Sequence, residues 1–253
     1  VTIPIMMPAI LVMGMGPMLS WGKADIVGIL TKSLPSILLA ILISSIFFWV
    51  YRSYNMLGLV GIILAFWIMS NILLIIVRQL IIKNREIKHE TIPKYSSGMI
   101  VAHFGIALLI LGITGSSIWQ KEKIIRMKVN DETSIHNYNI IFKEISEVMG
   151  PNYVALQGNF WVYNNKKNII TKLKPENRFY PVTNNSTTEA SIHTNLSRDL
   201  YLVLGDGDVN RGWIVRIYYN PLVVWIWIGA FAIFLGGLFS MKNNFQKLKR
   251  LSI

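Results

Sequence analysis

The chain has 253 residues, of which 53% are hydrophobic and only 15% are charged, so it is too apolar for an ordinary soluble domain. Its net charge is +12, but the basic residues flank long apolar runs rather than forming an amphipathic helix or a basic aromatic sheet, so we expect no nucleic-acid partner. Cysteine is absent, which excludes disulfides and thiolate metal ligands within the chain. This composition favours a lipid bilayer as the surroundings, with membrane lipid as a partner.

Apolar runs divide most of the chain into membrane segments. The first run, residues 3–19, is interrupted by prolines and glycines that kink or break helices, and we expect it to be embedded in the membrane. Further runs approach or exceed the roughly 17–25 apolar residues that cross the hydrocarbon, and they contain no Asp, Glu, Lys or Arg: 34–50, 56–77, 98–119 and 221–241. The sequence therefore predicts an α-helical polytopic membrane protein with about five membrane segments.

Basic residues in two segments predict the orientation. Lysines and arginines are concentrated in the loop after Val77 and in the tail 242–253, and such residues collect on the cytoplasmic side of membranes. Both segments are therefore expected on the cytoplasmic side or its equivalent, which places residues 120–220 on the outer side. Tryptophans then lie at the outer helix ends, as an interfacial aromatic belt would require: Trp49, Trp119, Trp225 and Trp227.

The outer stretch, residues 120–220, has the pattern of a small all-β domain. Short runs rich in Ile, Val, Tyr, Phe and Trp are separated by clusters of Asn, Gly, Pro and Lys, which predicts a small sandwich or barrel. The predicted strands are Ile124–Val129, Tyr138–Ile145, Tyr153–Tyr163, Ile169–Leu173, Leu200–Leu204 and Trp213–Tyr219. The polar residues 183–188 are expected to form a loop.

A short polar connection joins the last two predicted strands. Asp206–Gly212 contains glycine, so Asp199–Gly205 and Trp213–Tyr219 should pair as a hairpin that leads into the last helix. The same connection begins like a calcium-binding loop. However, Arg211 replaces the glycine of the sharp turn and Ile217 replaces the bidentate glutamate, which favours a plain hairpin.

Of the four histidines, one lies inside a predicted membrane segment. His89, His136 and His193 lie in polar segments or at a strand end, where a solvated or locally bonded imidazole is the ordinary interpretation. His103 instead lies roughly 8 Å inside the end of its helix at 1.5 Å per residue. Ionisable side chains at such depths are functional candidates, and the small neighbour Gly105 would let a flat macrocycle approach. The alternative is a histidine that donates one hydrogen bond across a packed helix interface, and the residues alone leave both readings open.

The sequence lacks the residue patterns that are typical of several other classes of function. The sequence contains no Ser-His-Asp arrangement, no nucleotide-binding glycine loop and no pair of carboxylates within the membrane segments. A transporter or channel would therefore lack the polar residues that usually form its pathway.

Four sets of motifs occur in an order that resembles one family. They are Met-Gly-Met-Gly-Pro at 13–17 with Trp21, Gly-Met-Ile-Val-Ala-His-Phe-Gly at 98–105, Thr-Glu-Ala-Ser-Ile at 188–192 with Arg-Asp-Leu-Tyr-Leu-Val-Leu-Gly at 198–205, and Arg-Ile-Tyr-Tyr-Asn-Pro-Leu-Val-Val-Trp-Ile-Trp-Ile-Gly at 216–229 with Gly236 and Gly237. Together they resemble the C-terminal portion of the CcmF family, the membrane haem lyase subunits of multi-component cytochrome c maturation. The resemblance spans nearly the whole chain.

The resemblance implies that haem is attached covalently to apocytochrome c on the outer side of the membrane. It implies a haem chaperone, CcmE, and CcmH-type apocytochrome-handling proteins as partners. Members of the family hold a b-type haem between two membrane histidines, and His103 matches the second of them. If His103 ligates iron, its Nδ1 should donate to a carbonyl or another polar group, so that Nε2 is free for the metal.

The family's other haem-handling elements are not in this sequence. Its tryptophan-rich loop, two flanking outer histidines and other membrane histidine lie N-terminal to the portion that the chain resembles. The second axial ligand would thus come from outside this chain, from an N-terminal portion of the haem lyase. We expect either a separately encoded C-terminal subunit or the product of a truncated gene, in a bacterial or mitochondrial inner membrane, with the β-domain in the periplasm or intermembrane space.

A non-catalytic role is the main alternative. In that interpretation the chain is a membrane scaffold or fragment whose outer domain docks maturation partners, and His103 is a packing residue.

Overall fold

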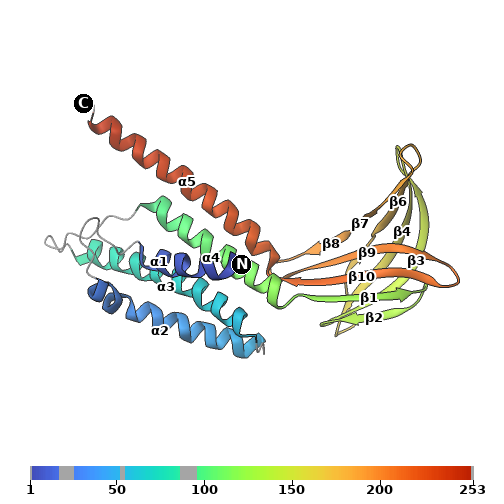
Figure 1. The fold of residues 1–253 in the computed structure, drawn as a ribbon, viewed down its shortest axis with the longest axis horizontal. Helices are drawn as coiled ribbons and strands as arrows, with labels where there is room; N and C mark the ends of the chain where they lie inside the picture. The colour runs from blue at the N-terminus through green and yellow to red at the C-terminus, as the bar shows by residue number, and fades with distance from the viewer. Residues whose placement is uncertain (1, 17–25, 52–54, 86–95, 252–253) are drawn as a thin grey trace. The chain divides into compact units, whose positions relative to one another are not determined.

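The computed structural model describes residues 2–16, 26–51, 55–85 and 96–251. The chain divides into two compact units (Figure 1). One, the helical unit, comprises residues 1–114 and 225–253, and the other, the β-domain, comprises residues 115–224. This organisation confirms the predicted fold class of apolar membrane helices with one small all-β domain.

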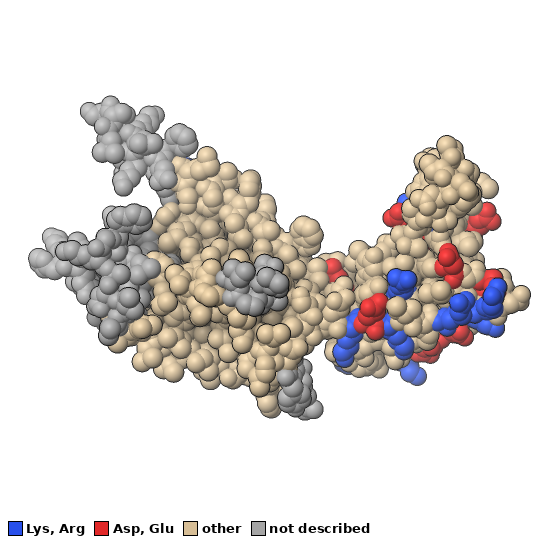
Figure 2. Space-filling model, viewed as in Figure 1, with Lys and Arg blue, Asp and Glu red and all other residues tan. Residues whose placement is uncertain are grey.

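The helices are α1 (Thr2–Met15), α2 (Ile26–Tyr51), α3 (Met56–Arg85), α4 (Ser97–Ile118) and α5 (Val223–Leu251). Among the described residues, four helices are long and apolar enough to cross a membrane, through Leu30–Trp49, Met56–Ile81, Ser97–Ile118 and Val223–Lys242. The apolar part of α1 is shorter, and the end of the run predicted at residues 3–19 lies outside the described residues. In Figure 2 the coloured charged side chains gather on the β-domain, whereas the described surface of the helical unit is almost uniformly tan.

Two helix boundaries differ from the prediction. Helix α2 begins at Ile26 rather than Leu34, so that Pro35 lies inside the helix and the exposed Lys32 belongs to it. Pro221 ends a strand and Leu222 adopts a left-handed backbone (φ 61°), so α5 begins only at Val223. Because α5 continues to Leu251, most of the segment predicted as a separate basic tail is helical.

Helix α1 is tied to α3 through one tryptophan. The indole Nε1 of Trp67 donates to the Leu11 carbonyl at 3.2 Å. Gly14 permits this contact, because a Cβ at that position would overlap the Trp67 ring. Trp67 also joins the buried cluster that includes Ala40 of α2 and Ala107 of α4, so the four helices share one core.

The β-domain contains ten strands within residues 121–221, a stretch described throughout. They are β1 (Lys121–Met127), β2 (Glu132–Ile135), β3 (Tyr138–Met149), β4 (Val154–Asn164), β5 (Ile169–Leu173), β6 (Glu176–Tyr180), β7 (Asn185–Glu189), β8 (Ser191–Thr194), β9 (Arg198–Asp208) and β10 (Gly212–Pro221). One sheet has the order β1-β10-β9-β8. The other has the order β2-β3-β4-β6-β7, with β5 also paired to β4.

Alternating side chains along the strands build the core of the β-domain. In β9, Leu200, Leu202 and Leu204 are fully buried, whereas the residues between them face outward. Phe142 and Phe160 of the facing sheet stack with their ring centroids 4.4 Å apart and complete this core.

The sequence prediction missed four strands. The missed strands, β2, β6, β7 and β8, are polar or short. Residues 183–184 lie in a turn, but the rest of the loop predicted at residues 183–188 was wrong, because Asn185–Glu189 is a strand. β7 pairs with β6 in register from Glu176↔Glu189 to Tyr180↔Asn185, although its side chains are mostly exposed. Ladder hydrogen bonds to a neighbour form these strands, and a search for hydrophobic alternation does not detect them.

The predicted hairpin is confirmed. β9 and β10 pair antiparallel from Gly212↔Asp208 to Pro221↔Arg198, and α5 follows directly. At the turn, the Asp208 carboxylate accepts hydrogen bonds from the backbone N–H groups of Asn210 and Arg211, at 2.9 and 2.7 Å. These bonds hold the pKa of Asp208 below its ordinary value. The carboxylate thus stabilises a turn, as the plain hairpin reading requires.

Candidate functional site

His103 lies on α4, and its imidazole is fixed by its own helix. Nδ1 lies 2.9 Å from the Met99 carbonyl oxygen, one helical turn earlier. Because a carbonyl only accepts, Nδ1 carries the proton and donates, as the sequence analysis expected for a metal-binding histidine. When the imidazole is neutral, Nε2 is then the unprotonated nitrogen, with its lone pair available. The residue is half-buried.

The residues around His103 allow close helix packing. A Cβ on Gly105 would lie 2.7 Å from the Gly229 carbonyl oxygen of α5, and one on Gly236 would lie 2.6 Å from the Ala102 backbone nitrogen. Helices α4 and α5 therefore contact each other through their backbones, as small residues permit in membranes. Ala107, on another side of α4, is buried against the helical core. These contacts hold the turn that carries His103.

His103 is the one histidine of the helical unit within the part of the chain that the structure describes. His89 lies outside the described residues, and His136 and His193 belong to the β-domain. Among the described residues no group of three or more His, Asp or Glu side chains could hold a metal ion.

The structure reveals a buried arginine that the sequence analysis did not single out as a site. Arg198 is 1% exposed, and its guanidinium lies over the Tyr138 ring, 4.5 Å from the centroid. Nε donates to the Tyr138 hydroxyl at 3.0 Å, and Nη1 donates to Nδ1 and to the carbonyl of His193, at 2.8 and 2.7 Å. Among the described residues it forms no ion pair. The alternation of β9 was the available signal, because Arg198 shares the inward face with Leu200.

Both histidines of the β-domain have a lowered pKa. Burial and the Arg198 charge lower the pKa of His193, and the nearby Asp199 opposes this shift. Burial and the Lys121 charge lower the pKa of His136, whose ring lies 4.4 Å from the Tyr219 ring between centroids. Hydrogen bonds and ring contacts thus occupy both imidazoles, as the ordinary interpretation of these residues predicted.

Comparisons with known proteins identify the family. Residues 118–221 match the family described as the CcmF C-terminal beta-sandwich. This chain corresponds to the C-terminal portion of CcmF. It is 34% identical over 236 residues to the cytochrome c-type biogenesis protein CcmF of Escherichia coli K12, covering 92% of this chain and 35% of that protein. It is 30% identical over 251 residues to CcmF of Pseudomonas fluorescens, covering 98% of this chain and 37% of that one.

A solved structure, named Cytochrome c Heme Lyase CcmF, supports the same fold. It matches with a TM-score of 0.68 at 20% identity, over 93% of this chain and 38% of that one. The chain thus spans a little over a third of the length of these CcmF proteins. The family and the fold, including the membrane helices and the β-sandwich, are therefore those that the sequence motifs indicated.

Proposed function

We propose that this chain is the C-terminal part of a haem lyase that attaches haem covalently to apocytochrome c, and that His103 supplies one axial ligand of a b-type haem. The Nδ1 hydrogen bond of His103 to Met99 carries the proposal, because it fixes the tautomer that can bind iron. CcmF relatives are named as cytochrome c biogenesis proteins, and a solved relative is named a haem lyase.

The residues around His103 fit a porphyrin ligand. The imidazole ring is oriented by its own helix, and the residue is half-buried. When bound between two imidazoles, haem iron supplies electron transfer without an open position for oxygen. His103 holds and orients one side of that site, and α5 supports it through the Gly105 contact. The other three histidines lie outside the predicted membrane segments, so the second ligand comes from the N-terminal portion of the lyase.

The proposed partners follow from the family. They are the N-terminal portion of the lyase, the haem chaperone CcmE, CcmH-type proteins that handle apocytochrome, and apocytochrome c itself. The β-domain lies in the periplasm or intermembrane space, an orientation supported by the basic residues after Val77 and after Met241. A topology reporter after Met241 should be active only inside, and one inserted near Asn185 only outside. Activity of both on the same side would refute this orientation.

The ligand role is tested by substituting His103 in the chain co-expressed with the N-terminal portion of a CcmF relative. Both His103→Ala and His103→Gln should abolish the low-spin haem spectrum of the assembled complex and block cytochrome c maturation. Glutamine can keep the hydrogen bond to Met99, but it does not ligate haem iron strongly. His136→Gln, a histidine of the β-domain, is the matched control and should leave the spectrum unchanged.

The interpretation of His103 as a packing residue predicts different effects for the two variants. His103→Gln would then be nearly normal in both assays, and His103→Ala would destabilise the helices by roughly 1 kcal/mol, as membrane hydrogen bonds usually contribute. An unchanged low-spin spectrum in the glutamine variant would remove His103 as a ligand.

A further inference from the structure

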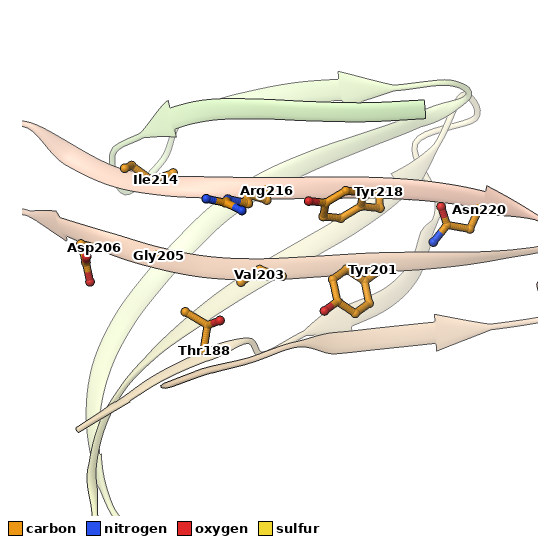
Figure 3. Close-up of a pocket in the computed structure, with 9 residues that line it drawn as sticks. All are labelled: Thr188, Tyr201, Val203, Gly205, Asp206, Ile214, Arg216, Tyr218 and Asn220. Carbon is orange, nitrogen blue, oxygen red and sulfur yellow. The ribbon is translucent and has the colours of Figure 1, made fainter. Parts of the chain in front are cut away.

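The outward face of the four-stranded sheet of the β-domain is hollowed into a cavity of about 480 Å³ (Figure 3). Val203 and Ile214 contribute apolar surface, Gly205 adds no side chain, and polar side chains project around them. The polar lining residues are Thr188, Tyr201, Asp206, Arg216, Tyr218 and Asn220. On β9 and β10 these positions alternate with the buried ones, so the hydrophobic core does not account for the two tyrosines or the arginine.

The cavity is held in shape from one side by the polar strands that the sequence did not predict. Thr188 of β7 lines it, and β7 is paired along its length with β6. β6 is in turn attached to β9, because the Asn177 amide donates to the Asp206 carboxylate at 2.9 Å. The wall is therefore part of the folded domain.

The charged side chains around the cavity differ in the partners that they have within the domain. Asp206 accepts from Asn177, and the Glu122 carboxylate accepts from the Tyr218 hydroxyl, which raises the pKa of Tyr218. Arg216 donates to the same phenol oxygen, but it forms no ion pair among the described residues. Asp206 and Glu122 thus have donors within the domain, whereas the Arg216 guanidinium pairs with no carboxylate in the described part of the chain.

Two further features indicate that the missing partner is a protein rather than a free anion. Ile124 pairs with Arg216 and Ile192 pairs with Tyr201, so both isoleucines share the outward face, and they are 57% and 52% exposed. A small anion would leave this apolar surface uncovered, whereas a polypeptide would bury it. Tyrosine and arginine are also the residue types that dominate the binding energy of protein interfaces.

We propose that this cavity docks a segment of a partner protein that places an acidic side chain on Arg216. Its carboxylate would accept charge-assisted hydrogen bonds from the guanidinium. The neighbouring Ile124 and Ile192 would pack against apolar side chains that flank the acidic residue.

A peptide library tests the proposal without knowledge of the natural partner. A randomised heptapeptide library is selected on the full chain in phosphatidylcholine nanodiscs, and the enriched peptides are synthesised for fluorescence-anisotropy titrations. We expect them to contain Asp or Glu, and Arg216→Gln should weaken their binding by about tenfold or more, as loss of a charge-assisted pair would. Replacing the peptide's Glu with Gln should weaken binding similarly, and the two changes together should weaken it little further.

Arg211→Gln is the matched control. Arg211 lies on the same hairpin, is 82% exposed and pairs with Asp208 outside the cavity, so its loss removes the same charge. Binding should be unchanged in this variant. Enriched peptides without acidic residues, or equal weakening by both arginine variants, would overturn the proposal. Arg216-dependent binding of phosphatidylglycerol vesicles with no enriched peptide would make the cavity a lipid site instead. The assay requires no haem, so its failure leaves the proposal for His103 untouched.

Discussion

The two units differ in how many large apolar side chains they leave on the surface. In the β-domain the large apolar residues Phe142 and Phe160 are fully buried. In the helical unit Trp227 is 72% exposed and Phe231 is 61% exposed, whereas Asn71 is 1% exposed. A helix surface covered with large apolar groups is stable where lipid, rather than water, surrounds it. Burial of apolar area therefore holds the β-domain together, whereas close packing of small residues and internal hydrogen bonds hold the helices together.

The largest expected effect is in the core of the β-domain. Phe142→Ala should lower its free energy of unfolding by about 3–5 kcal/mol, because it removes a fully buried ring that stacks on Phe160. Proteolysis of the β-domain across a urea series would measure the loss. Ile124→Ala, at an exposed position of the facing sheet, should cost less than about 1 kcal/mol. Equal losses would mean that burial is not what stabilises this unit.

A smaller effect is expected where α4 and α5 meet. Gly105→Leu should destabilise the helical unit by roughly 1–3 kcal/mol, because a side chain there would push apart backbones that are in contact. Unfolding in an SDS titration, followed by far-ultraviolet circular dichroism, would show it. Gly237→Leu on α5 is the control, since a Cβ at Gly237 meets nothing within 4 Å. If the two variants unfold alike, the close approach of these helices does not contribute to stability.

The smallest expected effect is the pH dependence of the β-domain. Arg198 can only donate, so the imidazole Nδ1 of His193 must be unprotonated to accept its hydrogen bond. The pKa of His193 is lowered in the folded protein, so below about 6.5, its ordinary value, the unfolded chain takes up the proton first. Stability is thus complete above that value and is lost as the pH falls through the folded pKa.

The urea midpoint of the domain, measured at neutral and at mildly acidic pH, should report this loss. His193→Gln should make the urea midpoint depend less on pH. The pH dependence that remains should come from His136, whose pKa is also lowered. If the pH dependence of the urea midpoint is unchanged in His193→Gln, the contact between His193 and Arg198 is not its source.

Different parts of this protein were predictable to different degrees. The membrane helices could be predicted because each satisfies its backbone hydrogen bonds within one apolar run, which length and composition reveal. The position of His103 and the direction of its Nδ1 hydrogen bond were equally accessible, since the acceptor is one turn away on the same helix. The strands with buried faces, such as β9 and β10, were visible in the sequence as alternating hydrophobic residues.

Tertiary structure decided the rest, because it depends on partners that are distant in the sequence. β7 is a strand because β6 offers it hydrogen bonds, and Arg198 is tolerated in the core because Tyr138 and His193 accept its donors. The cavity on the outward face exists because β6 and β7 fold back along β9, so that residues far apart in the chain line one hollow. A local sequence pattern determines a helix, because the backbone hydrogen bonds of a helix form within one segment. Contacts between separate strands determine which polar side chains lie next to one another.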